Sequence, residues 1–104
     1  MARVSRTFRV DPSDIFRIGI DWRGSDPGPR LADDEAITAS TWTVPTGITK
    51  LADSFADAET AIVLSEPTAG ETYQLSNKIV TDLELTTGVY HTLERTVEVI
   101  VEEL

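Results

Sequence analysis

Cysteine is absent from the 104-residue sequence, and the single histidine is His91. The lack of cysteine excludes disulfides, cysteine-ligated metal sites and thiol catalysis together. Long apolar runs are missing as well, since a stretch such as residues 61–64 is far shorter than the roughly 20 apolar residues of a membrane-spanning helix. No apolar stretch follows Arg3 and Arg6, so we expect no signal peptide and no membrane partner.

Residue sets that carry chemistry are equally scarce. His91 follows a turn at Gly88, and no pattern marks a nucleophile for it to activate, so we interpret it as a surface residue. Asp33, Asp34 and Glu35 offer oxygen atoms to a cation, but their spacing matches no calcium loop, and we interpret them as a solvated acidic loop. The glycines lack the spacing of a phosphate-binding loop. We therefore predict a protein that is not an enzyme, without catalytic, cofactor-binding or metal-binding residues.

Basic residues are few and unevenly placed. The chain has 9 Lys and Arg against 18 Asp and Glu, which gives a net charge of −9 at pH 7. Residues 1–30 hold six arginines against four aspartates, whereas residues 31–104 hold three basic residues against fourteen acidic ones. The acidic body is expected to repel nucleic acid phosphates. The N-terminal arginines suit docking onto an acidic neighbour, and the alternative is that the acids only keep the domain soluble.

What the sequence does contain is a strand pattern that recurs about every ten residues. Val, Ile, Thr and aromatic residues alternate with polar ones in segments that end at Pro, Gly or Asp. These segments are residues 6–10, 15–22, 37–44, 48–55, 60–65, 71–81 and 92–101. The spacing predicts an all-β fold, an immunoglobulin-like antiparallel β-sandwich of about seven strands. We expect residues 12–104 to form this single domain and residues 1–11 to form an N-terminal basic arm or an edge strand.

A few aromatic and basic residues stand out as structural or binding candidates. Trp42 is expected to pack in the core, whereas Trp22 adjoins the long unpatterned stretch of residues 22–36 and is the better candidate for an interface anchor. Tyr73 begins a late strand, where immunoglobulin-like domains place a tyrosine that bonds the backbone of the preceding corner. The interface candidates are Arg3, Arg6, Arg9, Trp22, Arg23 and Arg30, and the structural residues are Trp42, Tyr73 and Leu75.

The ordered set of segments resembles a family of small immunoglobulin-like phage virion proteins that are described as fiber–tail adaptors. The likeness covers about residues 12–101. It runs from Asp14-Ile15 and Gly19-Ile20-Asp21-Trp22 through residues 36–45, 53–55 and 60–65 to residues 69–79. The sequence departs from the family pattern in a longer, proline-rich loop from Arg23 to Glu35 and in an extended pair of strands around Asp82 to Glu94.

The resemblance implies a non-enzymatic structural protein of the virion, placed at the tail, neck or fiber junction and assembled in the host cytoplasm. Its partners would be other virion proteins, and several copies would form a symmetric ring. The alternative is a stand-alone β-sandwich binding module of the carbohydrate-binding or adhesin type, which would need an exposed aromatic platform. Neither alternative calls for nucleic acid or a cofactor.

Overall fold

The computed structural model describes residues 4–24 and 31–102, with side chains from Arg6 onward. These residues form seven strands, and none of them lies in a helix long and apolar enough to span a membrane. The strands are β1 (Val4–Val10), β2 (Ile15–Asp21), β3 (Ile37–Thr43), β4 (Thr49–Phe55), β5 (Glu59–Ser65), β6 (Thr72–Thr86) and β7 (Val89–Val101). The predicted all-β sandwich of about seven strands is confirmed.

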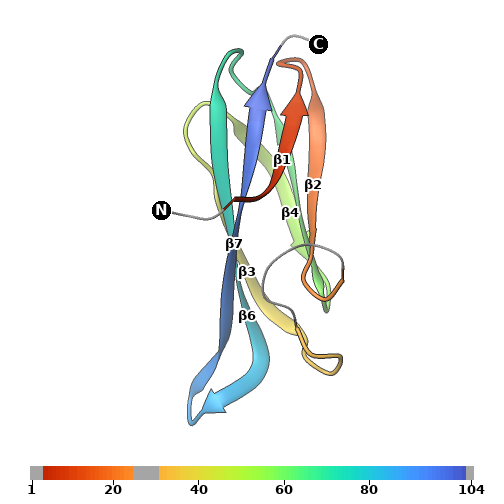
Figure 1. The fold of residues 1–104 in the computed structure, drawn as a ribbon, viewed down its shortest axis with the longest axis vertical. Helices are drawn as coiled ribbons and strands as arrows, with labels where there is room; N and C mark the ends of the chain where they lie inside the picture. Colours follow the sequence, from red (N-terminus) through yellow and green to blue (C-terminus); the bar gives the residue numbers. More distant parts are fainter. Residues whose placement is uncertain (1–3, 25–30, 103–104) are drawn as a thin grey trace.

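The strands form two sheets that pack face to face (Figure 1). One sheet has the order β1-β7-β6-β3 and the other has the order β2-β5-β4. Neighbouring strands are antiparallel except for β1, which pairs in parallel with β7 from Val4↔Thr96 to Val10↔Val101. The three-strand cores β3-β6-β7 and β2-β5-β4 follow the strand order of immunoglobulin-like domains. Residues 4–10 therefore lie in the sheet as an edge strand.

The core forms where the two inner faces meet. Because side chains alternate between the faces of a strand, every second residue of β6 from Tyr73 to Thr81 is buried. Val97, Val99 and Val101 do the same on β7. The opposite sheet contributes Ile18, Ile20, Ile62 and Leu64, and the two tryptophans and Leu31 complete the cluster.

Tyr73 fixes one end of the sandwich. Its hydroxyl donates to the carbonyl of Gly47 at 3.0 Å and accepts the amide of Thr68 at 3.2 Å, so it ties two loops to the start of β6. Gly47 has a φ of +104°, and a Cβ atom there would lie 2.7 Å from the Tyr73 hydroxyl. Leu75, two residues along β6, is fully buried. The corner thus needs both the glycine and the tyrosine.

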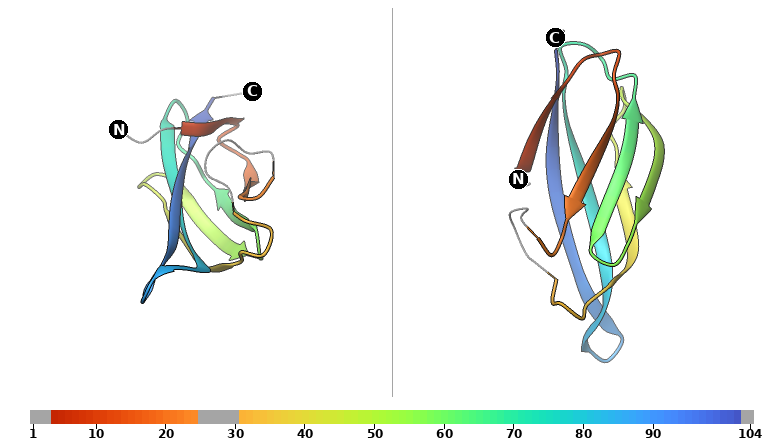
Figure 2. Two further views of the ribbon diagram at one scale, coloured as in Figure 1. Left: turned by 60° about the horizontal axis from the view of Figure 1, so that its bottom comes forward. Right: turned by 90° about the vertical axis from the view of Figure 1, so that its right-hand side faces the viewer.

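The strands differ greatly in length, and this sets the shape of the molecule. β6 has 15 residues and β7 has 13, whereas each strand of the opposite sheet has seven. The domain measures 48 × 23 × 22 Å. Two views show the far end of the β6–β7 pair extending beyond the rest of the sandwich (Figure 2).

Candidate functional site

The extension of β6 and β7 forms a protruding hairpin, residues 82–91, because Thr92 already pairs with Val80 inside the sandwich. β3 pairs with β6 only as far as Thr81, and β1 pairs with β7 only from Thr96 onward. Among the described residues, the hairpin strands therefore have no neighbour except each other. A two-stranded ribbon is marginally stable in water when it stands alone. Beyond the bond of the Asp82 amide to Ala36 at the base, neither edge of the hairpin pairs with another strand of the described chain.

Apolar side chains cover this hairpin although it lies outside the core. Every residue from Asp82 to Tyr90 is exposed. The exposed large apolar side chains are Leu83 (42%), Leu85 (60%), Val89 (51%) and Tyr90 (46%). Only three others are exposed to this degree in the described chain, namely Ile15, Leu51 and Phe55. Large apolar side chains that gather on a projecting element are typical of a surface for another molecule.

The tip of the hairpin is a tight turn through Thr87 and Gly88. Thr86 pairs with Val89, which leaves two residues in the turn. Gly88 adopts a φ of +77°, a conformation that glycine takes without steric cost. The amide of Gly88 donates to the carboxylate of Glu84 at 2.9 Å. These features hold the turn without any contact from the sandwich.

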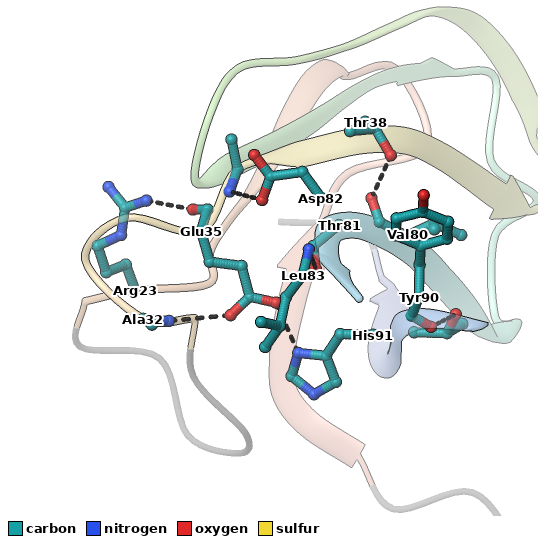
Figure 3. Close-up of polar contacts among 12 residues, drawn as sticks. Arg23, Ala32, Glu35, Thr38, Val80, Thr81, Asp82, Leu83, Tyr90 and His91 are labelled. Atoms are coloured by element: carbon teal, nitrogen blue, oxygen red, sulfur yellow. Dashed lines mark hydrogen bonds and ion pairs between the residues drawn. The ribbon is translucent and has the colours of Figure 1, made fainter. Parts of the chain in front are cut away.

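A buried carboxylate anchors the base of the hairpin (Figure 3). Glu35 is only 3% exposed, and its Oε2 accepts the Thr81 hydroxyl from β6 and Nδ1 of His91 from β7, the latter at 2.6 Å. Its Oε1 accepts the amide of Ala32 at 3.0 Å. One side chain thus joins both hairpin strands to the segment that leads into β3. The interpretation of Glu35 as solvated is wrong, because its side chain is buried, whereas His91 is partly exposed and bonds to it at this junction.

Backbone contacts reinforce the same junction. The Asp82 carboxylate accepts the amide of Ala36, and the Asp82 amide donates to the Ala36 carbonyl, each at 2.9 Å. Arg23 donates from Nη2 to the Glu35 carbonyl at 2.5 Å. The base of the hairpin is thereby fixed by Glu35 and Ala36, and Arg23 holds that segment in turn.

The electrostatics of Glu35 follow from these contacts. Burial raises the pKa of Glu35, but hydrogen bonds from Thr81, Ala32 and His91, together with the charge of His91, outweigh burial and lower the pKa below its ordinary value of 4.5. The carboxylate is therefore ionised in the folded protein at neutral pH. No group of three or more potential metal ligands occurs in the part of the chain that the structure describes.

The chain matches the model of one protein family over residues 11–99, which is most of its length. The family is described as podophage GP4 fiber-tail adaptor protein gp77. This protein belongs to that fiber-tail adaptor family. The match confirms the resemblance seen in the sequence and supports a structural role. No curated protein and no solved structure matched the chain.

The predicted interface residues of this fiber-tail adaptor family member that the structure describes lie in different surroundings. Arg6 and Arg9 are exposed on β1, where Arg6 lies 4.9 Å from the centre of the Phe8 ring and Arg9 pairs with Glu102 at 2.8 Å. Arg23 is partly buried and bonded to Glu35, as described above. Arg3 and Arg30 lie outside the described residues.

Trp22 is part of the hydrophobic core. It is fully buried, so it does not offer the exposed ring that the predicted interface anchor would need. Its Nε1 donates to the Thr60 hydroxyl at 3.0 Å, and Thr60 donates to Oδ1 of Asn77 at 2.6 Å, which links the two sheets through the core. The Arg95 guanidinium lies 4.5 Å from the Trp22 ring centre. Trp42 is also buried, at 9% exposure.

The aromatic residues of the adaptor domain do not form an exposed platform of the kind that binds sugars. Trp22, Trp42 and Tyr73 are buried, and Phe8 and Phe16 are partly buried against the core. The exposed rings of Phe55 and Tyr90 lie on β4 and β7, which belong to different sheets. The alternative of a carbohydrate-binding module therefore gains no support from this arrangement.

Proposed function

We propose that this protein is a non-enzymatic structural adaptor of the virion, placed at the tail, neck or fiber junction and bound there through protein–protein contacts. The observation that carries the proposal is the family match over residues 11–99. We further propose that it enters the particle from the host cytoplasm and that several copies form a symmetric ring. Its partners are other tail, neck or fiber proteins.

The structure supports an adaptor role because it combines a rigid body with a projecting element that can bind a partner. A two-sheet core and the Tyr73 corner give a rigid body, and a hairpin with a fixed base and an apolar surface projects from one end. Projecting strands with free edges are suited to pairing with another chain. Catalysis has no comparable support, because the one histidine of the chain is bonded to a structural carboxylate.

A gene deletion tests the proposal. Phage that lack this gene are expected to yield particles with heads and tails but without fibers, as seen by negative-stain electron microscopy. Mass spectrometry of wild-type particles should detect the protein in a fixed ratio to tail proteins. Expression of the wild-type gene from a plasmid should restore the fibers. Deletion particles that carry a normal set of fibers would overturn the assignment.

A further inference from the structure

The protruding hairpin combines three properties that define the kind of surface it fits. It exposes Leu83, Leu85, Val89 and Tyr90, it has unpaired edges on both strands within the described chain, and its base is fixed by Glu35. Contact between these apolar side chains and water is unfavourable, and a partner that covered them would remove this free-energy cost. The fixed base means that little ordering of the hairpin is needed when it binds.

The charge of the hairpin indicates the charge of its partner. Residues 82–91 contain Asp82 and Glu84 and no lysine or arginine. Glu84 points to the face of the strand opposite Leu83 and Leu85, and its carboxylate accepts the Gly88 amide. A cleft that takes in the tip of the hairpin would therefore have this charge at its edge. Opposite charges at such a rim favour association, and like charges oppose it. A cleft that accepts this hairpin should therefore carry basic groups at its edge.

A second copy of the same chain does not meet this requirement at its far end. The pairing of Val10 with Val101 places the β1–β2 and β5–β6 loops at the end of the sandwich opposite the hairpin. Described acidic residues at that end are Asp11, Asp14, Glu66, Glu71 and Glu102. Arg9 and Lys50 lie there too, but Arg9 pairs with Glu102 at 2.8 Å and Lys50 pairs with Asp53 at 2.7 Å. A head-to-tail contact between two copies, each with a net charge of −9, would bring acidic groups together.

We propose that the β6–β7 hairpin docks this adaptor onto a different virion protein, inserting Leu85 and Val89 into an apolar cleft edged by lysine or arginine. The inference rests on the proposed function, which supplies the other virion proteins as partners. It goes further by naming the element that binds, the side chains that enter the cleft and the charge of the surface that receives them.

Binding to adaptor-free particles tests the docking element. Particles from the deletion phage are incubated with purified protein, and the bound amount is measured by co-sedimentation over a range of concentrations. The double variant Leu85→Ser, Val89→Ser should bind at least about tenfold more weakly than wild type, because central apolar anchors carry most of the affinity of an interface. The matched control is Ile15→Ser, Leu51→Ser, which removes two equally exposed apolar side chains elsewhere and should bind like wild type.

A charge reversal tests the chemistry of the partner. Glu84→Lys should weaken binding about threefold to tenfold, and added salt should weaken the binding of wild type more than that of the variant. Glu59→Lys reverses an exposed charge on β5 and serves as the control. Thermal unfolding followed by circular dichroism should show that all four variant proteins are folded at the temperature of the binding assay.

The possible outcomes separate the two proposals. If wild-type protein binds and the Leu85→Ser, Val89→Ser variant binds equally well, the hairpin is not the docking element, and the adaptor role stands. Glu84→Lys binding as tightly as wild type would overturn the basic cleft. If light scattering shows that purified wild type forms oligomers that the serine variant loses, the occupant is a second copy and the named partner is wrong. If wild type does not bind adaptor-free particles and is absent from virions, the proposed function itself fails.

Discussion

The Glu35 junction gives a sharp test of how the hairpin is held. We expect Glu35→Gln to destabilise the folded domain, because the carboxylate accepts hydrogen bonds with both oxygens. Oε1 accepts the Ala32 amide, and Oε2 accepts Thr81 and His91. A glutamine has nearly the same volume but only one acceptor oxygen. With its NH₂ group toward the Ala32 amide, the glutamine would face a donor. In the other orientation Thr81 and His91 would both have to change from donor to acceptor, and every bond to a charged carboxylate would be lost.

The magnitude follows from the burial of these groups. Glu35 is 3% exposed and Thr81 is 1% exposed, so water does not replace the lost acceptor. Hydrogen bonds to charged groups contribute about 1.5 to 3 kcal/mol each to stability. Loss of one or two of them at this site should lower the free energy of unfolding by about 2 to 3 kcal/mol. For a domain of this size the melting temperature should fall by about 10 to 20 °C.

Urea unfolding followed by tryptophan fluorescence measures this change, because Trp22 and Trp42 are both buried in the folded state. The slope of the free energy against urea should stay the same, and the midpoint should fall by about 1 to 2 M. Glu59→Gln, an exposed site on β5, is the matched control and should stay within about 0.5 kcal/mol of wild type. A Glu35→Gln variant as stable as this control would refute the assignment of Glu35 as the anchor.

The pH dependence has a definite sign. The pKa of Glu35 is lower in the folded protein than its ordinary value of 4.5. Its ionised form therefore stabilises the fold fully above pH 4.5, and this contribution is lost as the pH falls through the folded pKa. The stability difference between wild type and Glu35→Gln should be constant just above that pH and should close below it. A difference that widened toward acid would contradict the reasoning.

Three further changes test the rest of the fold by urea unfolding. Tyr73→Phe removes the bonds to Gly47 and Thr68 and should cost about 1 to 2 kcal/mol, whereas no loss would show that the corner is not a stabilising contact. Thr60→Val removes the hydrogen-bond partner of Trp22 Nε1 and of Asn77 Oδ1 and should lower the free energy of unfolding by about 2 to 4 kcal/mol. Little change would show that these two groups do not need Thr60 as a partner. Deletion of residues 1–10 removes β1 with the buried Val10, so circular dichroism should show a lower melting temperature, and an unchanged one would mean that β1 adds nothing to stability.

Much of the fold could be predicted from the sequence because a strand is a local pattern. The alternation of Tyr73, Leu75, Asn77 and Ile79 placed these residues on one face, and all four are buried in the structure. Turn residues such as Pro45 and Gly47 marked where strands end. The seven expected segments correspond to the seven strands, with shifts of a few residues at their ends.

The sequence pattern predicted the hairpin only in part. The strands expected at residues 71–81 and 92–101 stop short of it, and the pair of strands around Asp82 to Glu94 was expected to be extended only by comparison with the family pattern. The pattern could not show that the opposite sheet is too short to cover it. Because alternation looks the same for a covered and an uncovered strand, the exposed apolar side chains of the hairpin were missed as a candidate surface.

The sequence by itself determined the fold class, the strand rhythm and the excess of acid, because each depends on neighbouring residues or on simple counts. Only the tertiary structure decided that Trp22 is buried, that Glu35 meets His91 across 56 residues, and that Leu85 faces solvent. These outcomes depend on which strands lie opposite one another. Burial and pairing are properties of two segments at once, and a linear pattern describes only one.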